Sequence, residues 1–231
     1  MNPLITIYLP TKNRLQTLKR AVNSVLNQTY KNFELIVVDD ASTDNTLHLV
    51  QSFNCEKLKI IPLKKNVGKS DAVKIATKNL KADVLFFCDG DLHNFKNDHI
   101  KQVLEPFKYK KMIMSVGIRD YGKVVNFLSK NIFPLITGER AIPYSVFKEV
   151  SKDPLMKNYG LEVVLNNYCK INNILIYKSI LKGLRQTNKP TKRKNGFYLL
   201  LKQSIELTIV ISKLKFRNYK NSIKRILNKN N

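Results

Sequence analysis

The sequence has few cysteines and no long apolar run. Its three cysteines, Cys55, Cys88 and Cys169, lie far apart without the paired spacing of zinc sites or disulfide frameworks. We therefore expect reduced thiols and an intracellular protein. No apolar stretch reaches the ~18 residues of a membrane span, and the chain passes from Asn2 and Pro3 directly into a strand-like segment. We expect neither a spanning helix nor a signal peptide.

Acidic residues are also scarce. The 231 residues include 41 Lys and Arg against 17 Asp and Glu, for a formal net charge of +24. Such a charge favours phosphorylated substrates, anionic lipid or nucleic acid as partners. About half of this positive excess lies between Lys182 and the end of the chain. That segment contains fourteen Lys and Arg and a single acid, Glu206. A lysine-rich genome is the competing explanation, but it does not account for this clustering.

Strand-like and helix-like segments alternate through the first half of the chain. Apolar runs bounded by turn residues are followed by apolar residues at helical spacing. This alternation is typical of a parallel sheet that is covered by helices on both faces. The predicted strands are 5–9, 33–38, 58–63 and 84–88.

The second half is less regular. The pattern predicts helices at 96–107 and 144–150 and from residue 160, strands at 112–116 and 174–177, and a mixed, largely helical connection at 121–132.

The run at 84–88 is followed by Asp89, Gly90 and Asp91. In extended geometry the two carboxylates project to the same side, and Gly90 permits a bend between them. Neighbouring hard oxygen ligands suit Mg²⁺ or Mn²⁺, which takes its other ligands from water and substrate phosphates. Ligands bind at this edge of open α/β sheets. The alternative is an exposed turn, in which Asp and Gly are also favoured.

Polar residues mark other turns of the predicted sheet. Thr11 follows the first strand, Asp39 ends the second, and Lys69 begins a helix after a glycine turn. Because the carboxyl ends of parallel strands share one edge, we expect Thr11, Asp39 and the two later aspartates to line one crevice. Asp39 would accept hydrogen bonds from a base or ribose, and Lys69 would meet phosphate at a helix N-terminus. Capping of a turn is the alternative for Asp39.

Three charged residues of the second half flank glycines near predicted element starts: Glu139, Arg140 and Glu162. Their positions alone leave their roles open. Acids are enriched in the first turns of helices, so capping is the alternative for both glutamates.

The carboxyl-terminal segment is basic and partly apolar. Residues 183–195 form a basic linker. Residues 196–214 are rich in large apolar side chains but are interrupted by Lys202 and Glu206, and residues 216–227 mix apolar and basic side chains at helical spacing. The segment is too polar to span a membrane, whereas a basic amphipathic helix is typical of membrane surfaces. Packing of one or both helices on the main domain is the alternative.

Several motifs resemble those of family 2 glycosyltransferases, over about residues 4–180. They are IYLPTKNR at 7–14, LIVVDDASTD at 35–44, NVGK at 66–69 and CDGDL at 88–92. Two later segments, GERA at 138–141 and YGLE at 159–162, are more similar to the branch of polyprenyl-phosphate sugar synthases and glucosyl-3-phosphoglycerate synthases.

The resemblance implies an α/β fold of the GT-A (Rossmann-like) type, with a mostly parallel sheet flanked by helices. We expect this domain at residues 1–182 and a basic amphipathic helical tail at 183–231.

The resemblance also implies roles for single residues. Asp39 would bind the base of a nucleotide-sugar, in a pocket that the turn with Pro10, Thr11 and Arg14 also lines. Lys69 would complete the nucleotide site. The pair Asp89 and Asp91 would hold Mg²⁺ or Mn²⁺ on the diphosphate, and the segments with Glu139, Arg140 and Glu162 would lie near the acceptor. Glu139 or Glu162 would then activate or orient the acceptor, and Arg140 would steady an acidic acceptor or the diphosphate.

The chain also departs from the family pattern. Inverting members often carry a Glu-Asp pair as the acceptor base region, whereas here Arg140 follows Glu139. Members similar to the phosphoglycerate enzymes supply a metal-binding His after the last core strand, and residues 184–186 contain none. Inversion or retention at the sugar, and the third protein ligand of the metal, therefore stay open.

These patterns predict a metal-dependent glycosyltransferase that moves a sugar from a nucleoside-diphosphate sugar to an acceptor hydroxyl or phosphate. The acceptor would be a glycan, a lipid-phosphate or a small phosphorylated molecule, and the enzyme would be cytoplasmic and peripheral on an anionic membrane. A sugar nucleotidyltransferase is one alternative, because it uses a similar fold and metal. A nucleic-acid-binding module is favoured by charge alone, without interleaved aromatics or a binding motif, so we expect no nucleic-acid partner.

Overall fold

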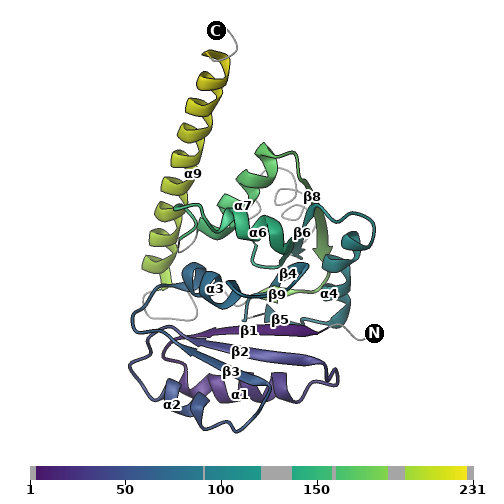
Figure 1. The fold of residues 1–231 in the computed structure, drawn as a ribbon, viewed down its shortest axis with the longest axis vertical. Helices are drawn as coiled ribbons and strands as arrows, with labels where there is room; N and C mark the ends of the chain where they lie inside the picture. Colours follow the sequence, from purple (N-terminus) through teal and green to yellow (C-terminus); the bar gives the residue numbers. More distant parts are fainter. Residues whose placement is uncertain (1–3, 91, 121–136, 158–159, 187–195, 228–231) are drawn as a thin grey trace. The chain divides into compact units, whose positions relative to one another are not determined.

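The computed structural model describes residues 4–90, 92–120, 137–157, 160–186 and 196–227. Its contacts divide the chain into two compact units, Met1–Lys81 and Ala82–Asn231. Each unit combines a sheet with helices (Figure 1). The predicted α/β class is therefore confirmed, while the predicted domain boundary at residue 182 stays a prediction.

The first unit is a three-stranded parallel sheet in the order β1-β2-β3, with a helix after each strand. The alternation that the sequence predicts for this part of the chain is confirmed. Its elements are β1 (Ile5–Thr11), α1 (Leu15–Leu26), β2 (Phe33–Asp39), α2 (Thr46–Gln51), β3 (Leu58–Pro62) and α3 (Lys69–Thr77).

Successive side chains of the central strand β2 point to opposite faces of the sheet and pack against different helices. Leu35 and Val37 belong to one buried cluster with residues of α1 and α2. Ile36 and Val38 belong to another with residues of α3. A strand that is buried on both faces needs an unbroken apolar run, and this run is what the sequence contains there.

The second unit is built on a four-stranded sheet in the order β4-β7-β6-β8. β7 is antiparallel to both of its neighbours, whereas β6 and β8 are parallel, and β5 and β9 form a short separate ladder. Its elements are β4 (Val84–Phe87), β5 (Leu92–His93), α4 (Asn97–Leu104), the 3-10 helix η1 (Glu105–Lys108), β6 (Ile113–Arg119), β7 (Arg140–Pro143), α6 (Tyr144–Val150), α7 (Gly160–Ile171), β8 (Leu175–Leu181), β9 (Arg185–Gln186) and α9 (Gly196–Leu227).

Two details of this unit differ from expectation. The sequence pattern made β4 a fourth parallel strand, but β4 pairs antiparallel with β7. The pattern missed β7 because its apolar core is only Ala141 and Ile142, between Arg140 and Pro143. The tail, expected as two helical segments, is one continuous helix, α9. The predicted connection at 121–132 lies outside the described residues.

Helix α9 packs against α7 within the second unit. Leu214 is 3% exposed, Arg217 forms an ion pair of 2.6 Å with Asp153, and the amide of Asn218 donates to Asn167 Oδ1 at 2.8 Å. Part of the tail therefore packs on the protein. In the described part of the chain, no helix combines the length and apolarity that crossing a bilayer needs.

Candidate active site

The turns after β1 and β2 lie side by side, because Thr11 and Asp39 are register partners in the parallel pair. The Asp39 carboxylate is 1% exposed. Its Oδ2 accepts the backbone N–H of Ser42 at 3.0 Å, and its Oδ1 accepts the Ser42 hydroxyl. The turn-capping role considered for Asp39 is thus present. An ionised carboxylate offers about four acceptor sites, so Asp39 retains capacity for a further donor.

Asn13 fastens the two turns together. Its backbone N–H donates to Ser42 Oγ at 2.9 Å, and its Oδ1 accepts the backbone N–H of Thr43 at 2.8 Å. Asn13 has φ 50° and Ala41 has φ 55°, which is the left-handed region that Asn tolerates and that costs Ala about 1 kcal/mol. The neighbouring Arg14 is exposed, and its N–H donates to Thr46 Oγ1 at 2.9 Å.

Thr11 carries a buried hydroxyl with no hydrogen-bond partner among the described residues. Leaving such a group unpaired costs about 1–3 kcal/mol. A ligand that bonds to Thr11 would recover this cost, so the hydroxyl fits the lining of a binding site. Pro10, the residue before it, is exposed.

Asp40 occupies the N-terminal end of α3. Its carboxylate accepts the backbone N–H groups of Val67 at 2.7 Å and Gly68 at 2.9 Å, in a turn where Gly68 has φ 82°. The Asp40 carboxylate therefore occupies two backbone N–H groups at the helix N-terminus where a phosphate was expected. The Lys69 side chain is exposed. Burial, and then the charge of Asp40, raises the pKa of the Tyr8 phenol far above its usual value.

In the second unit, Asp89 follows β4 and is paired with a residue that sequence reasoning missed. Arg119, at the end of β6, donates from Nη2 to Asp89 Oδ2 at 2.8 Å and to Glu139 Oε1 at 3.1 Å. Its Nε lies 3.1 Å from Glu139 Oε2. The side chains of Asp89, Arg119 and Glu139 are 22%, 12% and 0% exposed. Asp89 is thus the more accessible carboxylate of this cluster.

A glycine brings the backbone directly against the Asp89 carboxylate. A Cβ at Gly138 would lie 2.5 Å from Asp89 Cγ, closer than two carbon atoms pack. Gln186 of β9 also reaches this carboxylate, with Nε2 3.5 Å from Oδ2. The hydroxyl of Thr137 lies within hydrogen-bonding distance of Glu139 Oε2 and of the Gly117 carbonyl. The turn before β7 therefore contacts both carboxylates, Asp89 through Gly138 and Glu139 through Thr137.

Arg140 is completely buried. Its guanidinium donates to the Thr137 carbonyl at 2.7 and 3.1 Å, to Asn166 Oδ1 at 3.2 Å and to the Glu162 carbonyl at 3.4 Å. Burial lowers the pKa of Arg140, while the nearby charge of Glu162 opposes that shift. These contacts tie the turn at residues 137–140 to α7. The direct substrate contact expected for Arg140 is at odds with this burial.

Glu162 lies in the first turn of α7 and is half-buried, so an acid in that turn also favours the helix dipole. Asp91, the second predicted metal ligand, lies outside the described residues. No three His, Cys, Asp or Glu side chains in the described ranges gather as a metal cluster. Sequence reasoning assigned no role to Asp40 or Arg119. Their signals were a second aspartate directly after Asp39 and a single charge at the end of an apolar strand.

The class of protein follows from a comparison with known families. The family model "Glycosyl transferase family 2" matches residues 6–170, so the chain belongs to that family and is a glycosyltransferase.

Two curated relatives differ in length from this chain. An uncharacterized glycosyltransferase of Haemophilus influenzae is 27% identical over 188 residues, covering 80% of this chain and 67% of that protein. An uncharacterized glycosyltransferase of Rickettsia felis is 34% identical over 143 residues, covering 57% of this chain and 23% of that protein. The chain therefore spans a minor part of some relatives.

Solved structures of glucosyl-3-phosphoglycerate synthase from Mycobacterium tuberculosis resemble this fold. The complex with Mn²⁺, UDP and glucosyl-3-phosphoglycerate has a TM-score of 0.65 at 18% identity, covering 92% of this chain and 80% of that one. The complex with Mg²⁺ and UDP has a TM-score of 0.57 at 19% identity, covering 82% and 73%. At such identity the likeness shows the GT-A fold.

Proposed function

We propose that this chain transfers a sugar from a nucleoside-diphosphate sugar to an acceptor hydroxyl or phosphate, with Mg²⁺ or Mn²⁺ as cofactor. The observation that carries the proposal is the partly exposed Asp89 carboxylate. It follows β4, pairs with Arg119 and lies against Gly138. Membership of family 2 supports the reaction class, and the Mycobacterium tuberculosis synthase, solved with UDP and either metal, supports the donor and the cofactor.

The first unit would bind the nucleoside. Asp39 has acceptor capacity for an N–H of the base or a hydroxyl of the ribose, and the buried Thr11 hydroxyl is available for a further hydrogen bond. Pro10 and Arg14 extend the same turn, and the exposed Lys69 is a cation for the phosphates. Asp40 serves the pocket indirectly, since it fixes the turn that ends at Gly68.

The residues after β4 fit a divalent cation. Mg²⁺ and Mn²⁺ need only one or two carboxylates, because water and substrate phosphates complete the shell. Asp89 and Asp91 would supply carboxylates, and Gln186 brings a side-chain amide close to Asp89, whose oxygen is also a hard ligand. When bound, the cation would neutralise charge on the departing diphosphate.

Glu162 and Glu139 would then have different tasks. The acceptor oxygen bonds to the anomeric carbon of the sugar as the bond to the diphosphate breaks, and its proton needs a base. Glu162 is half-buried and suits that role, whereas Glu139 is fully buried on Arg119 and would hold that cation in position. Arg140 would position both glutamates, because its bonds join the turn that carries Glu139 to α7, which carries Glu162.

We further propose that the enzyme is cytoplasmic and peripheral on an anionic membrane, with a glycan, a lipid-phosphate or a small phosphorylated molecule as acceptor. The support is the basic tail, which carries fourteen Lys and Arg from Lys182 onward against one acid. Each basic residue near an anionic surface adds about 1 kcal/mol of attraction.

Calorimetry with nucleoside-diphosphate sugars, with and without Mn²⁺, tests the donor proposal. The wild type is expected to bind one donor in a metal-dependent manner, and Asp91→Ala is expected to lose that dependence. Product analysis completes the test, because a glycosyltransferase releases a nucleoside diphosphate whereas a nucleotidyltransferase releases pyrophosphate. Absence of binding in every combination would contradict the proposal.

A further inference from the structure

Helix α9 has a face that its packing on α7 does not explain. Five large apolar side chains on it are exposed by between 47% and 69%. At about 100° per residue they fall within an arc of about 80°. These residues, which we name the outer stripe, are Leu201, Ile205, Ile209, Phe216 and Tyr219.

The outer stripe lies opposite the packed face of the helix. Leu214, which is 3% exposed, lies about 180° from the middle of the stripe on the same wheel. The ion pair of Arg217 and the hydrogen bond of Asn218 belong to the packed face as well. The stripe, broken by Ser212 alone near its centre, is therefore a second apolar face and not part of the core.

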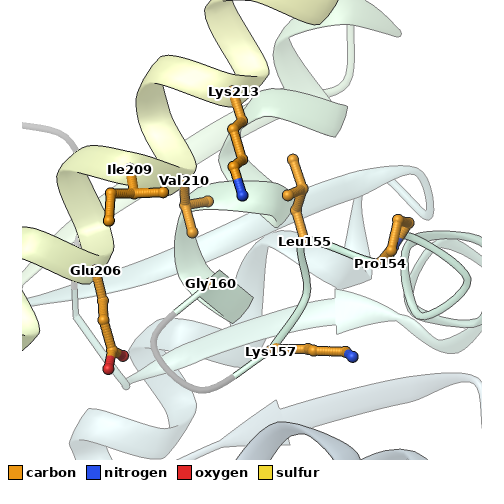
Figure 2. Close-up of a pocket in the computed structure, with 8 residues that line it drawn as sticks. All are labelled: Pro154, Leu155, Lys157, Gly160, Glu206, Ile209, Val210 and Lys213. Carbon is orange, nitrogen blue, oxygen red and sulfur yellow. The ribbon is translucent and has the colours of Figure 1, made fainter.

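A pocket lies between part of α9 and the rest of the second unit. It has a volume of about 290 Å³ and is lined, outside α9, by Pro154, Leu155, Lys157 and Gly160. Figure 2 shows that α9 contributes Glu206, Ile209, Val210 and Lys213 to the wall of this pocket. Ile209, at the edge of the outer stripe, lines this pocket and is still 47% exposed.

Lysines flank the outer stripe. On the helical wheel, Lys202, Lys213 and Lys220 lie along one edge of the stripe and Lys215 lies on the other. All four are exposed. An apolar band between rows of cations matches an anionic bilayer, with acyl chains beneath a layer of phosphates. It matches a second copy of this helix poorly, because pairing two stripes would bring lysines together, and Glu206 is the one acid of α9.

We propose that the outer stripe of α9 enters the acyl boundary of an anionic phospholipid bilayer, while the flanking lysines contact lipid phosphates. The inference rests on the proposed peripheral location and adds the contact surface. Helix α9 would lie in the plane of the interface, with its packed face on α7 and its outer stripe in the lipid. Tyr219 suits this depth, since a phenol places an apolar ring and a polar tip at the boundary.

Single tryptophan reporters test the orientation, because the chain contains no Trp. Phe216→Trp and Tyr219→Trp place the indole on the stripe, and Asn221→Trp places it at an exposed position on the other side of the same helix. Each full-length variant is mixed with phosphatidylglycerol and phosphatidylcholine vesicles whose acyl chains are brominated. Both stripe reporters should shift to the blue and be quenched, whereas the Asn221→Trp reporter should do neither.

Three results would overturn the proposal. Equal quenching of the stripe and control reporters would remove the orientation. Vesicle binding without quenching at Phe216→Trp and Tyr219→Trp would mean that charge alone holds the protein at the vesicle and that the stripe does not enter the acyl region. A blue shift that grows with protein concentration in the absence of vesicles would instead assign the stripe to a second copy of the chain.

A variant that keeps every lysine separates apolar insertion from charge. Leu201→Ser, Ile205→Ser and Phe216→Ser together should lower partitioning into anionic vesicles by about tenfold or more, since buried CH₂ groups supply much of such binding. Unchanged partitioning would contradict the proposal. Nucleotide binding in solution, measured on the same variant, should equal that of the wild type. Failure of the wild type to bind any donor would count against the proposed function and leave the reporter results standing.

Discussion

Asp39 ends strand β2 and Asp89 follows strand β4, but the two carboxylates are held in opposite ways. The carboxylate of Asp39 is bonded by Ser42, three residues later in its own turn. The carboxylate of Asp89 is bonded by Arg119, thirty residues away on another strand. One aspartate is therefore fixed by local turn chemistry and the other by the pairing of strands.

This difference matters for what each aspartate can do. A carboxylate that is held by hydrogen bonds from neutral groups remains an acceptor for further neutral donors such as a base N–H. A carboxylate with a guanidinium beside it belongs to a charged network, in which another cation changes the balance. We therefore expect substitutions at Asp89 to affect metal and turnover, and substitutions at Asp39 to affect nucleoside affinity.

The largest effect is expected for Asp89→Asn. Loss of a metal ligand should lower turnover on the order of a hundredfold or more, measured as release of nucleoside diphosphate. Asp83→Asn is the matched control, because Asp83 is an exposed aspartate just before the same strand. If Asp89→Asn kept Mn²⁺-dependent donor binding, Asp89 would not be a metal ligand.

A smaller effect is expected for Gly138→Ala. The new Cβ would lie 2.5 Å from Asp89 Cγ, so the carboxylate has to move away from its place beside Arg119. Strain of this kind should lower the free energy of unfolding by about 1–3 kcal/mol and weaken Mn²⁺-dependent binding in calorimetry. Gly90→Ala is the control for the free energy of unfolding, since a Cβ there meets nothing within 4 Å. Equal free energies of unfolding for the two variants would show that the close approach has no role.

For Asp39→Asn we expect nucleotide affinity to fall by about tenfold, because a charged acceptor is worth about 1.5–3 kcal/mol in a hydrogen bond and the amide replaces one oxygen by a donor. Turnover at saturating donor should change less. Asp44→Asn serves as control, as Asp44 is an exposed aspartate on the same loop whose Oδ1 accepts the Thr46 N–H at 3.0 Å. Unchanged affinity of Asp39→Asn for the nucleoside diphosphate that the wild type binds would end the proposed nucleoside role.

The smallest effect concerns Tyr8 in the first unit. Its hydroxyl is buried without a partner among the described residues, so Tyr8→Phe should raise the free energy of unfolding by about 1 kcal/mol at neutral pH. Burial raises the pKa of Tyr8 in the folded state, so the folded state holds the proton more tightly than the unfolded state. The contribution of this protonation to the free energy of unfolding is therefore fully present below the usual tyrosine pKa of about 10, and it is lost as the pH rises above that value.

Urea unfolding between neutral and alkaline pH measures this effect. Tyr8→Phe should flatten the loss of stability above pH ~10. The second unit keeps its own alkaline loss, since burial raises the pKa of Cys169 to about 11. An unchanged alkaline slope in Tyr8→Phe would mean that Tyr8 does not titrate on unfolding in this range.

The first unit could be predicted almost completely from the sequence. Its strands alternate with helices, its central strand is an unbroken apolar run, and Asn13 and Ser42 are residues that favour turns. The second unit could be predicted less well. β7 has only two apolar residues, between Arg140 and Pro143, so its sequence lacks a strand pattern. Its antiparallel pairing with β4 joins segments that lie more than fifty residues apart in the chain.

The sequence by itself determined the elements and the turns, because helix periodicity, strand burial and turn chemistry depend on residues that are close along the chain. It also determined the positions of Asp39 and Asp89 after their strands. Only the tertiary structure decided that Arg119 pairs with Asp89, that Arg140 is buried between a turn and α7, and that α9 turns an apolar face outward. The reason is physical: long-range pairing and burial depend on which surfaces meet, and no local pattern contains that information.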